Sequence, residues 1–176
     1  MTSVLTTYKP SIIFIVRFLL VYSLLVLLYG VYQSHYIDRT DPLTIWVGKT
    51  VTAFYRLFPI DAQTIPLTAE SGLKLILEGR YVARIVEGCT AASIIILFIS
   101  FILSIGKPFK KALLFAILGS LFIFLFNILR IVLLGYILYV APQHQTFAHQ
   151  ILFPVLIYGF VVFLWLVFIL KYYDPK

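Results

Sequence analysis

Long apolar stretches that contain almost no charge constrain this chain more than any other feature of its sequence. A helix needs about 17–25 apolar residues to cross the hydrocarbon core of a bilayer, which is roughly 30 Å thick. Four stretches meet this requirement, and we place the predicted spans at residues 11–32, 89–105, 112–140 and 150–170. The sequence therefore predicts an all-α, multi-pass bundle of transmembrane helices that forms one integral-membrane domain, residues 1–176.

The composition supports a membrane protein and argues against nucleic acid as a partner. The chain is 62% hydrophobic and 12% charged, whereas a soluble domain averages about 25% charged residues. The net charge of +7 is spread along the chain, and several basic residues flank apolar stretches, so they fit orientation in membrane lipid better than a nucleic-acid patch. We expect no cleavable signal peptide, because the first apolar stretch is too long and no small-residue cleavage site follows it.

Short basic loops set the expected orientation. The loop at 106–111 contains three lysines, whereas the loop at 141–150 contains no Lys or Arg. Further lysines stand before the first span and after the last span. By the positive-inside rule, both termini are cytoplasmic and segment 34–87 lies outside.

Two elements are expected in the external segment 34–87. Apolar alternation on either side of "EGR", residues 78–80, predicts a β-hairpin that ends just before Cys89. An upstream stretch has apolar side chains at helical spacing, which predicts an amphipathic helix in the membrane interface with Trp46 at headgroup level. The apolar face of this helix consists of Val47, Val51, Phe54, Tyr55 and Phe58.

Three chemically distinctive side chains fall at a similar predicted depth. Counted from the cytoplasmic ends of their spans, Cys89 and Arg130 each lie 18 residues in, and His149 lies 22 residues in. At 1.5 Å per helical residue these positions correspond to about 27 Å and about 33 Å. All three groups are therefore expected near the outer edge of the hydrocarbon core, where one thiol, one guanidinium and one imidazole share a layer.

Cys89 has two interpretations. A free cysteine is often a small buried hydrophobic side chain. Its predicted place on the first turn of a helix would instead favour a thiolate nucleophile, although Glu87 opposes that effect. A metal site is not expected, because the one Cys and three His lack the short spacing of zinc ligands.

The other two groups also have alternatives. An arginine inside a span costs at least about 2.5 kcal/mol and usually marks function, although Arg130 could extend to the outer headgroups. Asn127 precedes it by three residues on the same helical face and could orient the guanidinium. His149 opens a span and can point into the bundle as a general base, whereas His144 in the loop is expected to be more exposed.

The order of these residues resembles the exosortase/archaeosortase family of membrane proteases. The resemblance rests on four blocks, "VEGCTAASIIILFIS", "GKPFKKALLF", "FNILRIVLLGYIL" and "HQTFAHQILFPVLIYG", and the ending is most similar to the short branch called XrtF. It implies a catalytic set of Cys89, Arg130 and His149. The family usually has Gly two residues after the cysteine, where this chain has Ala91, and a positive φ at that position would be strained.

The resemblance also implies an activity. The chain would cleave the C-terminal sorting signals of exported proteins that carry a transmembrane tail, at the outer membrane face and through a thioester on Cys89. His149 would act as acid or base and protonate the departing amine, and Arg130 would stabilise the oxyanion or orient the imidazole. Asn127 and His144 are the expected substrate contacts, and neither a cofactor nor a metal is expected.

Two other functions stay open at this point. A non-catalytic membrane subunit could scaffold an envelope assembly, and then Cys89→Ala would be silent while Arg130 mattered for association. A channel or carrier could use Arg130 as an anion contact. The sequence gives little support to the channel, because it shows no inverted repeat.

Overall fold

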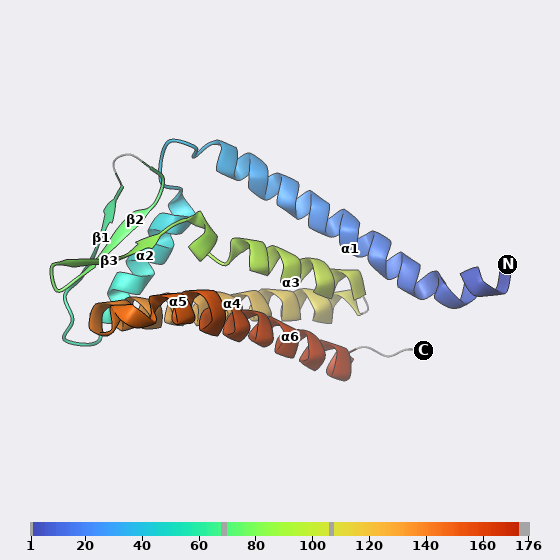
Figure 1. Cartoon of the computed structure of the whole chain (residues 1–176). Helices are drawn as coiled ribbons and strands as arrows, with labels where there is room; N and C mark the ends of the chain where they lie inside the picture. Colours follow the sequence, from blue (N-terminus) through green and yellow to red (C-terminus); the bar gives the residue numbers. More distant parts are fainter. Residues whose placement is uncertain (1, 68–69, 106–107, 173–176) are drawn as a thin grey trace.

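In the described structure, four helices run along the long axis of the molecule, and a small cap lies at one end (Figure 1). The computed structural model describes residues 2–67, 70–105 and 108–172. The lengthwise helices are α1 (Thr2–Ser34), α3 (Ala92–Ile105), α4 (Phe109–Val140) and α6 (Phe153–Tyr172). The cap contains a three-stranded sheet and a helix that crosses the bundle, and it lies at the end opposite to the start of α1 and the end of α6. The bundle therefore has two chemically different ends.

Three helices are long and apolar enough to cross a membrane, and they match three of the four predicted spans. The candidate spans are Tyr8–Ser34, Phe109–Val140 and Pro142–Tyr172. The prediction for residues 89–105 is wrong in its extent, since α3 has only 14 residues and is about 21 Å long. The reason is local, because residues 87–91 form a tight turn instead of a first helical turn. The described chain therefore has three long apolar helices and one short apolar helix.

The helices of the bundle pack through close contacts at small residues. Phe98 of α3 is fully buried and lies over Gly119 of α4, where a Cβ would approach the Phe98 ring to 2.4 Å. Phe126 of α4 stacks on Phe160 of α6 with ring centroids 4.8 Å apart. α1 packs against α3, but none of its most apolar 18-residue stretch is buried. A large apolar surface on α1 is therefore left for lipid.

The predicted hairpin is confirmed, and a third strand joins it. Strands β2 (Leu73–Leu77) and β3 (Arg80–Ile85) pair in antiparallel fashion, and β1 (Ala62–Pro66) pairs with the other edge of β2. Glu78 and Gly79 form the hairpin turn with φ of 48° and 73°, values that suit the tight turns of twisted hairpins. The all-α prediction is corrected by this sheet; the polar sequence of β1 has no apolar alternation that would have indicated a strand.

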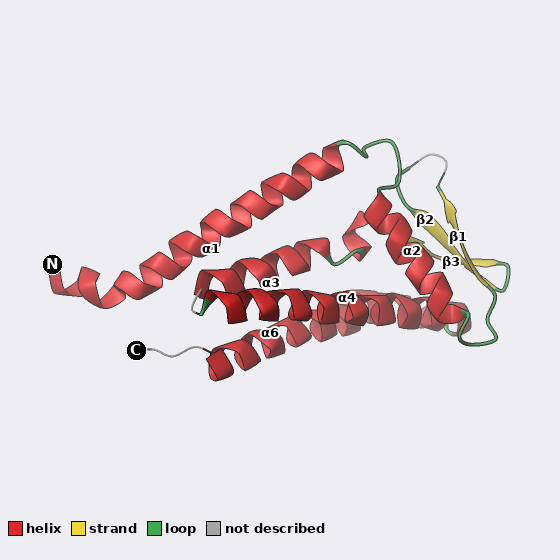
Figure 2. Cartoon of the chain, turned by 180° about the vertical axis from the view of Figure 1, so that it is seen from behind, coloured by secondary structure: helices red, strands yellow, loops and turns green. Residues whose placement is uncertain are grey.

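The predicted external helix exists as α2 (Pro42–Tyr55), but its apolar face contacts protein. The carboxylate of Asp41 caps its start by accepting the Thr44 N–H at 3.0 Å. The side chains of Val47, Val51 and Tyr55 are at most 1% exposed, because α2 packs on the sheet and on α4. The expectation that this face lies in the membrane interface is therefore wrong. Figure 2 shows α2 crossing the end of the bundle beside the sheet.

A buried tyrosine fastens the cap to the bundle. The Tyr55 hydroxyl donates a hydrogen bond of 2.5 Å to the carbonyl oxygen of Val132 in α4. Burial raises the pKa of the Tyr55 phenol, so the hydroxyl keeps its proton and remains a donor. Gly135 lies directly beneath, where a Cβ would be 2.6 Å from the hydroxyl oxygen and 2.9 Å from Leu75.

Gly135→Ala should therefore loosen the cap. The added methyl must displace the Tyr55 hydroxyl and Leu75, and we expect the free energy of unfolding to fall by about 1–3 kcal/mol. Gly159→Ala is the matched control, since nothing lies within 4 Å of a Cβ there. Thermal unfolding of the two variants in detergent measures the difference, and equal midpoints would contradict the close packing of Tyr55 on Gly135.

Candidate functional site

Cys89 lies on a tight turn between the sheet and α3. The turn is a single 3-10 segment, Glu87–Cys89, in which the Cys89 N–H donates to the Val86 carbonyl at 2.8 Å. α3 begins after it, at Ala92. The prediction that Cys89 occupies the first turn of a helix is wrong, so the helix dipole gives no argument for a thiolate here. The thiol is half-buried, and Cys89 is the chain's one free cysteine.

Ala91, two residues later, adopts the left-handed backbone conformation. Its φ is +61°, and it is only 5% exposed. A Cβ in this region costs roughly 1–2 kcal/mol, and glycine avoids that cost. Ala91 therefore has a positive φ and the backbone strain that we expected such a φ to cause at this position. It lets the chain reverse from the Cys89 turn into α3, where the Ala91 carbonyl accepts the Ile95 N–H at 2.9 Å.

A buried amide ties this turn to α4. The side-chain Nδ2 of Asn127 donates a hydrogen bond of 2.7 Å to the Cys89 carbonyl oxygen. Asn127 is only 1% exposed, so the bond is shielded from competing water. Arg130 follows three residues later on the same face of α4, close enough for a negative charge on the Cys89 sulfur to act on its guanidinium. The structure thus brings Cys89, Asn127 and Arg130 together.

Two buried polar atoms at this place have no hydrogen-bond partner within the described residues. They are Oδ1 of Asn127, an acceptor, and Nε of Arg130, a donor. An unsatisfied buried polar atom costs about 1–3 kcal/mol, and native structures contain few of them. These atoms offer one acceptor and one donor, which are the groups that a peptide N–H and a peptide C=O can bind.

Two tyrosines also border the site, although neither belongs to a recognisable sequence motif. Tyr158 of α6 interacts electrostatically with the Arg130 guanidinium. Tyr29 of α1 lies beside the Thr90 hydroxyl and accepts a hydrogen bond of 2.7 Å from Gln33. Tyrosines near the ends of spans are ordinary at membrane interfaces, so their sequence positions alone could not single them out.

His149 lies farther along the bundle than the other two predicted catalytic residues. It is exposed, in the π-helical segment Ala148–Leu152 that leads into α6. Measured from the stacked pair Phe126 and Phe160, Arg130 is four residues toward the cap and His149 eleven. This difference of seven residues, part of it in the π-helical segment, puts His149 nearer the cap than Arg130. No hydrogen bond joins His149 to Cys89 or Arg130 in the described part of the chain.

The remaining predicted contact, His144, is exposed in a second 3-10 segment, Pro142–His144, at the cap end of α4. A three-residue helix, α5 (Gln145–Phe147), connects it to the π-helical segment. Within the described ranges, no three His, Cys, Asp or Glu side chains gather into a possible metal site. The chemistry available at the site is therefore that of a thiol, a guanidinium, an amide and nearby phenols.

One comparison with known proteins identifies a family. The family model described as transmembrane exosortase (Exosortase_EpsH) matches residues 1–173. Comparison with curated proteins found no match, and comparison with solved structures found none. The matched range includes Cys89, Arg130 and His149.

Ala91→Gly should relieve the backbone strain beside Cys89. Glycine adopts a positive φ without steric cost, so we expect the free energy of unfolding to rise by about 0.5–1 kcal/mol. Ala92→Gly, one residue later inside α3, is the control and should lower it. Thermal unfolding in detergent measures both, and a lower midpoint for Ala91→Gly would refute the strain.

Asn127→Ala should release the Cys89 turn from α4. The loss of the bond to the Cys89 carbonyl should lower the free energy of unfolding by about 1–3 kcal/mol and raise the rate at which a thiol reagent labels Cys89. Ser120→Ala, also in α4, removes only a bond to the Ala116 carbonyl of its own helix, so its labelling rate should match wild type. Unchanged labelling of Asn127→Ala would count against the tether.

Proposed function

The chain belongs to the transmembrane exosortase family, and from this we propose that it is a membrane-embedded cysteine protease or transpeptidase of the short XrtF type. Its substrates are exported proteins that end in a sorting signal with a transmembrane tail. It cleaves them at the outer face of a bacterial cytoplasmic membrane, through a thioester on Cys89. Its partners are these substrate proteins and membrane lipid, and it needs no cofactor.

One observation carries the proposal more than any other. Asn127 Oδ1 and Arg130 Nε are buried without partners, next to a half-buried thiol on a turn held by Asn127. The carbonyl oxygen of a bound substrate backbone can accept from Nε, and an N–H of the same backbone can donate to Oδ1. Each such hydrogen bond would recover the cost of a buried unsatisfied atom.

The first half of the reaction follows from this placement. The Cys89 thiolate attacks the carbonyl carbon of the scissile bond. Negative charge develops on the carbonyl oxygen, and the Arg130 guanidinium stabilises it inside a site of low polarity. The tetrahedral intermediate collapses, the C–N bond breaks, and the amine of the transmembrane tail leaves with a proton taken from water, which received the thiol proton when the thiolate formed. The exported part of the substrate remains bound to Cys89 as a thioester.

The second half gives His149 its best-supported role. Its imidazole is exposed and lies nearer the cap than Arg130. An incoming amine or water reaches the thioester from that side if the cap faces outward, as the positive-inside rule requires. His149 is therefore placed to take a proton from the incoming nucleophile. Protonation of the departing amine is the alternative role of the same group.

The catalytic assignment predicts a sharp loss on substitution. Cys89→Ala should abolish processing, and Arg130→Gln should reduce its rate about 10²–10³-fold by removing oxyanion stabilisation. Arg84→Gln is the control, because Arg84 pairs with the exposed carboxylate of Glu70 in the cap. The size of a tail-bearing exported protein in cells reports processing. Normal processing by membrane-inserted Cys89→Ala would favour the scaffold function instead.

The two halves of the reaction can be separated. If His149 activates the incoming nucleophile, His149→Ala should accumulate substrate bound to Cys89, which hydroxylamine releases because it cleaves thioesters. Arg130→Gln should accumulate none, since the thioester forms too slowly. His35→Ala, whose ring bonds its own helix at the Val31 carbonyl, serves as the control. Absence of the adduct in His149→Ala, with processing slowed, would assign His149 to the departing amine.

A further inference from the structure

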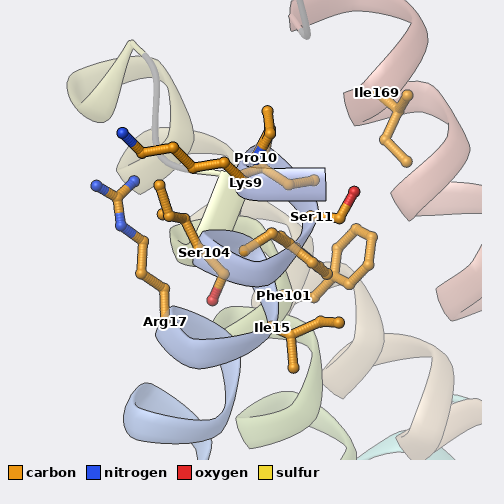
Figure 3. Close-up of a pocket in the computed structure, with 11 residues that line it drawn as sticks. Lys9, Pro10, Ser11, Ile15, Arg17, Phe101, Ser104 and Ile169 are labelled. Atoms are coloured by element: carbon orange, nitrogen blue, oxygen red, sulfur yellow. The ribbon is translucent and has the colours of Figure 1, made fainter. Parts of the chain in front are cut away.

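A groove opens at the end of the bundle opposite to Cys89, between α1, α3 and α6 (Figure 3). Its volume is about 730 Å³, which is within the range of small-molecule sites. Phe14 of α1 meets Phe101 of α3 edge-on in the groove, with ring centroids 5.5 Å apart. Ile105 and Ile169 extend the apolar wall. The site proposed for catalysis uses none of these residues.

Two cations line the same groove. Lys9 and Arg17, both on α1, extend to one side of that helix in Figure 3. Eight residues separate them, so Arg17 starts about 12 Å deeper along the helix than Lys9. A guanidinium at that depth is costly unless an anion, water or the headgroup region is within reach.

Within the described residues, no acidic side chain accompanies these two cations. Helices α1, α3 and α6 contain no Asp or Glu at all, and no acidic residue lines the groove among the described residues. The lysines at 110, 111 and 171 add further positive charge at this end. Among the residues that the structure describes, the groove therefore combines an apolar trough with two cations and no acidic lining residue.

We propose that this groove binds an anionic phospholipid of the cytoplasmic leaflet. The lipid phosphate lies between Lys9 and Arg17, and one acyl chain follows the apolar wall toward Phe14 and Phe101. This arrangement gives Arg17 an anion at its own depth and fills the trough with hydrocarbon. The inference does not depend on the proposed protease activity.

A transmembrane segment of another protein fits this groove less well. By the positive-inside rule, such a segment carries Lys or Arg at its cytoplasmic end. Those residues would face Lys9 and Arg17, and the like charges would repel each other. A phosphate removes that conflict, so charge complementarity selects the lipid.

Lipid retention by the purified full chain tests the proposal. The protein in detergent is titrated with phosphatidylglycerol or phosphatidylcholine, and native mass spectrometry counts bound lipid while thermal unfolding is followed. We expect phosphatidylglycerol to be retained and to raise the midpoint. Lys9→Gln combined with Arg17→Gln should weaken its apparent affinity about tenfold or more, since each cation contributes to attraction by anionic lipid. Lys110→Gln combined with Lys171→Gln removes the same charge outside the groove and should retain binding.

A third variant tests the trough without changing charge. Ser11→Trp places a large ring in the groove and should also prevent lipid retention, even if the Lys9 and Arg17 variant does not fold. Equal retention of phosphatidylcholine, an equal midpoint shift from inorganic phosphate alone, or equal losses in the two charge variants would overturn the proposal. Retention of phosphatidylglycerol by Ser11→Trp would overturn it as well.

Discussion

The hydrogen bond from Asn127 to the Cys89 carbonyl joins the two parts of this molecule. Its donor belongs to α4 in the helical bundle, whose outer surface is apolar. Its acceptor belongs to the turn that connects the sheet of the cap to α3 and contains Cys89. The bond is partly buried, with its donor Asn127 only 1% exposed, and its 2.7 Å length is that of a well-formed interaction. With the turn fixed to α4, the thiol and the Arg130 guanidinium keep a constant relation to each other. The proposed chemistry depends on that relation.

The backbone around Cys89 is strained, and polar atoms near it are unsatisfied. A left-handed alanine follows the cysteine at a position where a glycine would be unstrained. Two buried polar atoms beside it are left without partners in the described structure. Strain and unsatisfied polar groups persist only where the surrounding fold overdetermines them, and they gather at functional sites. Here the overdetermination comes from the cap, which is fixed to α4 by Tyr55 above Gly135.

Local patterns predicted much of the fold. Three of the four spans are present because apolar length is a property of each segment alone. The hairpin is present because alternation and a turn at Glu78–Gly79 are equally local. The errors concern what a segment packs against. The apolar face of α2 has the pattern of an interfacial helix, but the sheet and α4 cover it, and hydrophobic spacing does not reveal which apolar surface it will meet.

Some features of the candidate site could also be predicted from single segments, and others depend on tertiary packing. The sequence by itself determined that the chain enters a membrane, that a thiol and a guanidinium lie near one level, and that Asn127 shares a helical face with Arg130. These follow from hydrocarbon thickness and helical repeat, which act along a single segment. Only the tertiary structure decided that Cys89 lies on a turn and that Asn127 donates a hydrogen bond to the Cys89 carbonyl, 38 residues earlier in the sequence. It also decided that His149 lies nearer the cap than Arg130. Those outcomes depend on how separate helices pack against one another, and side-chain volume and hydrogen-bond geometry decide that packing in three dimensions.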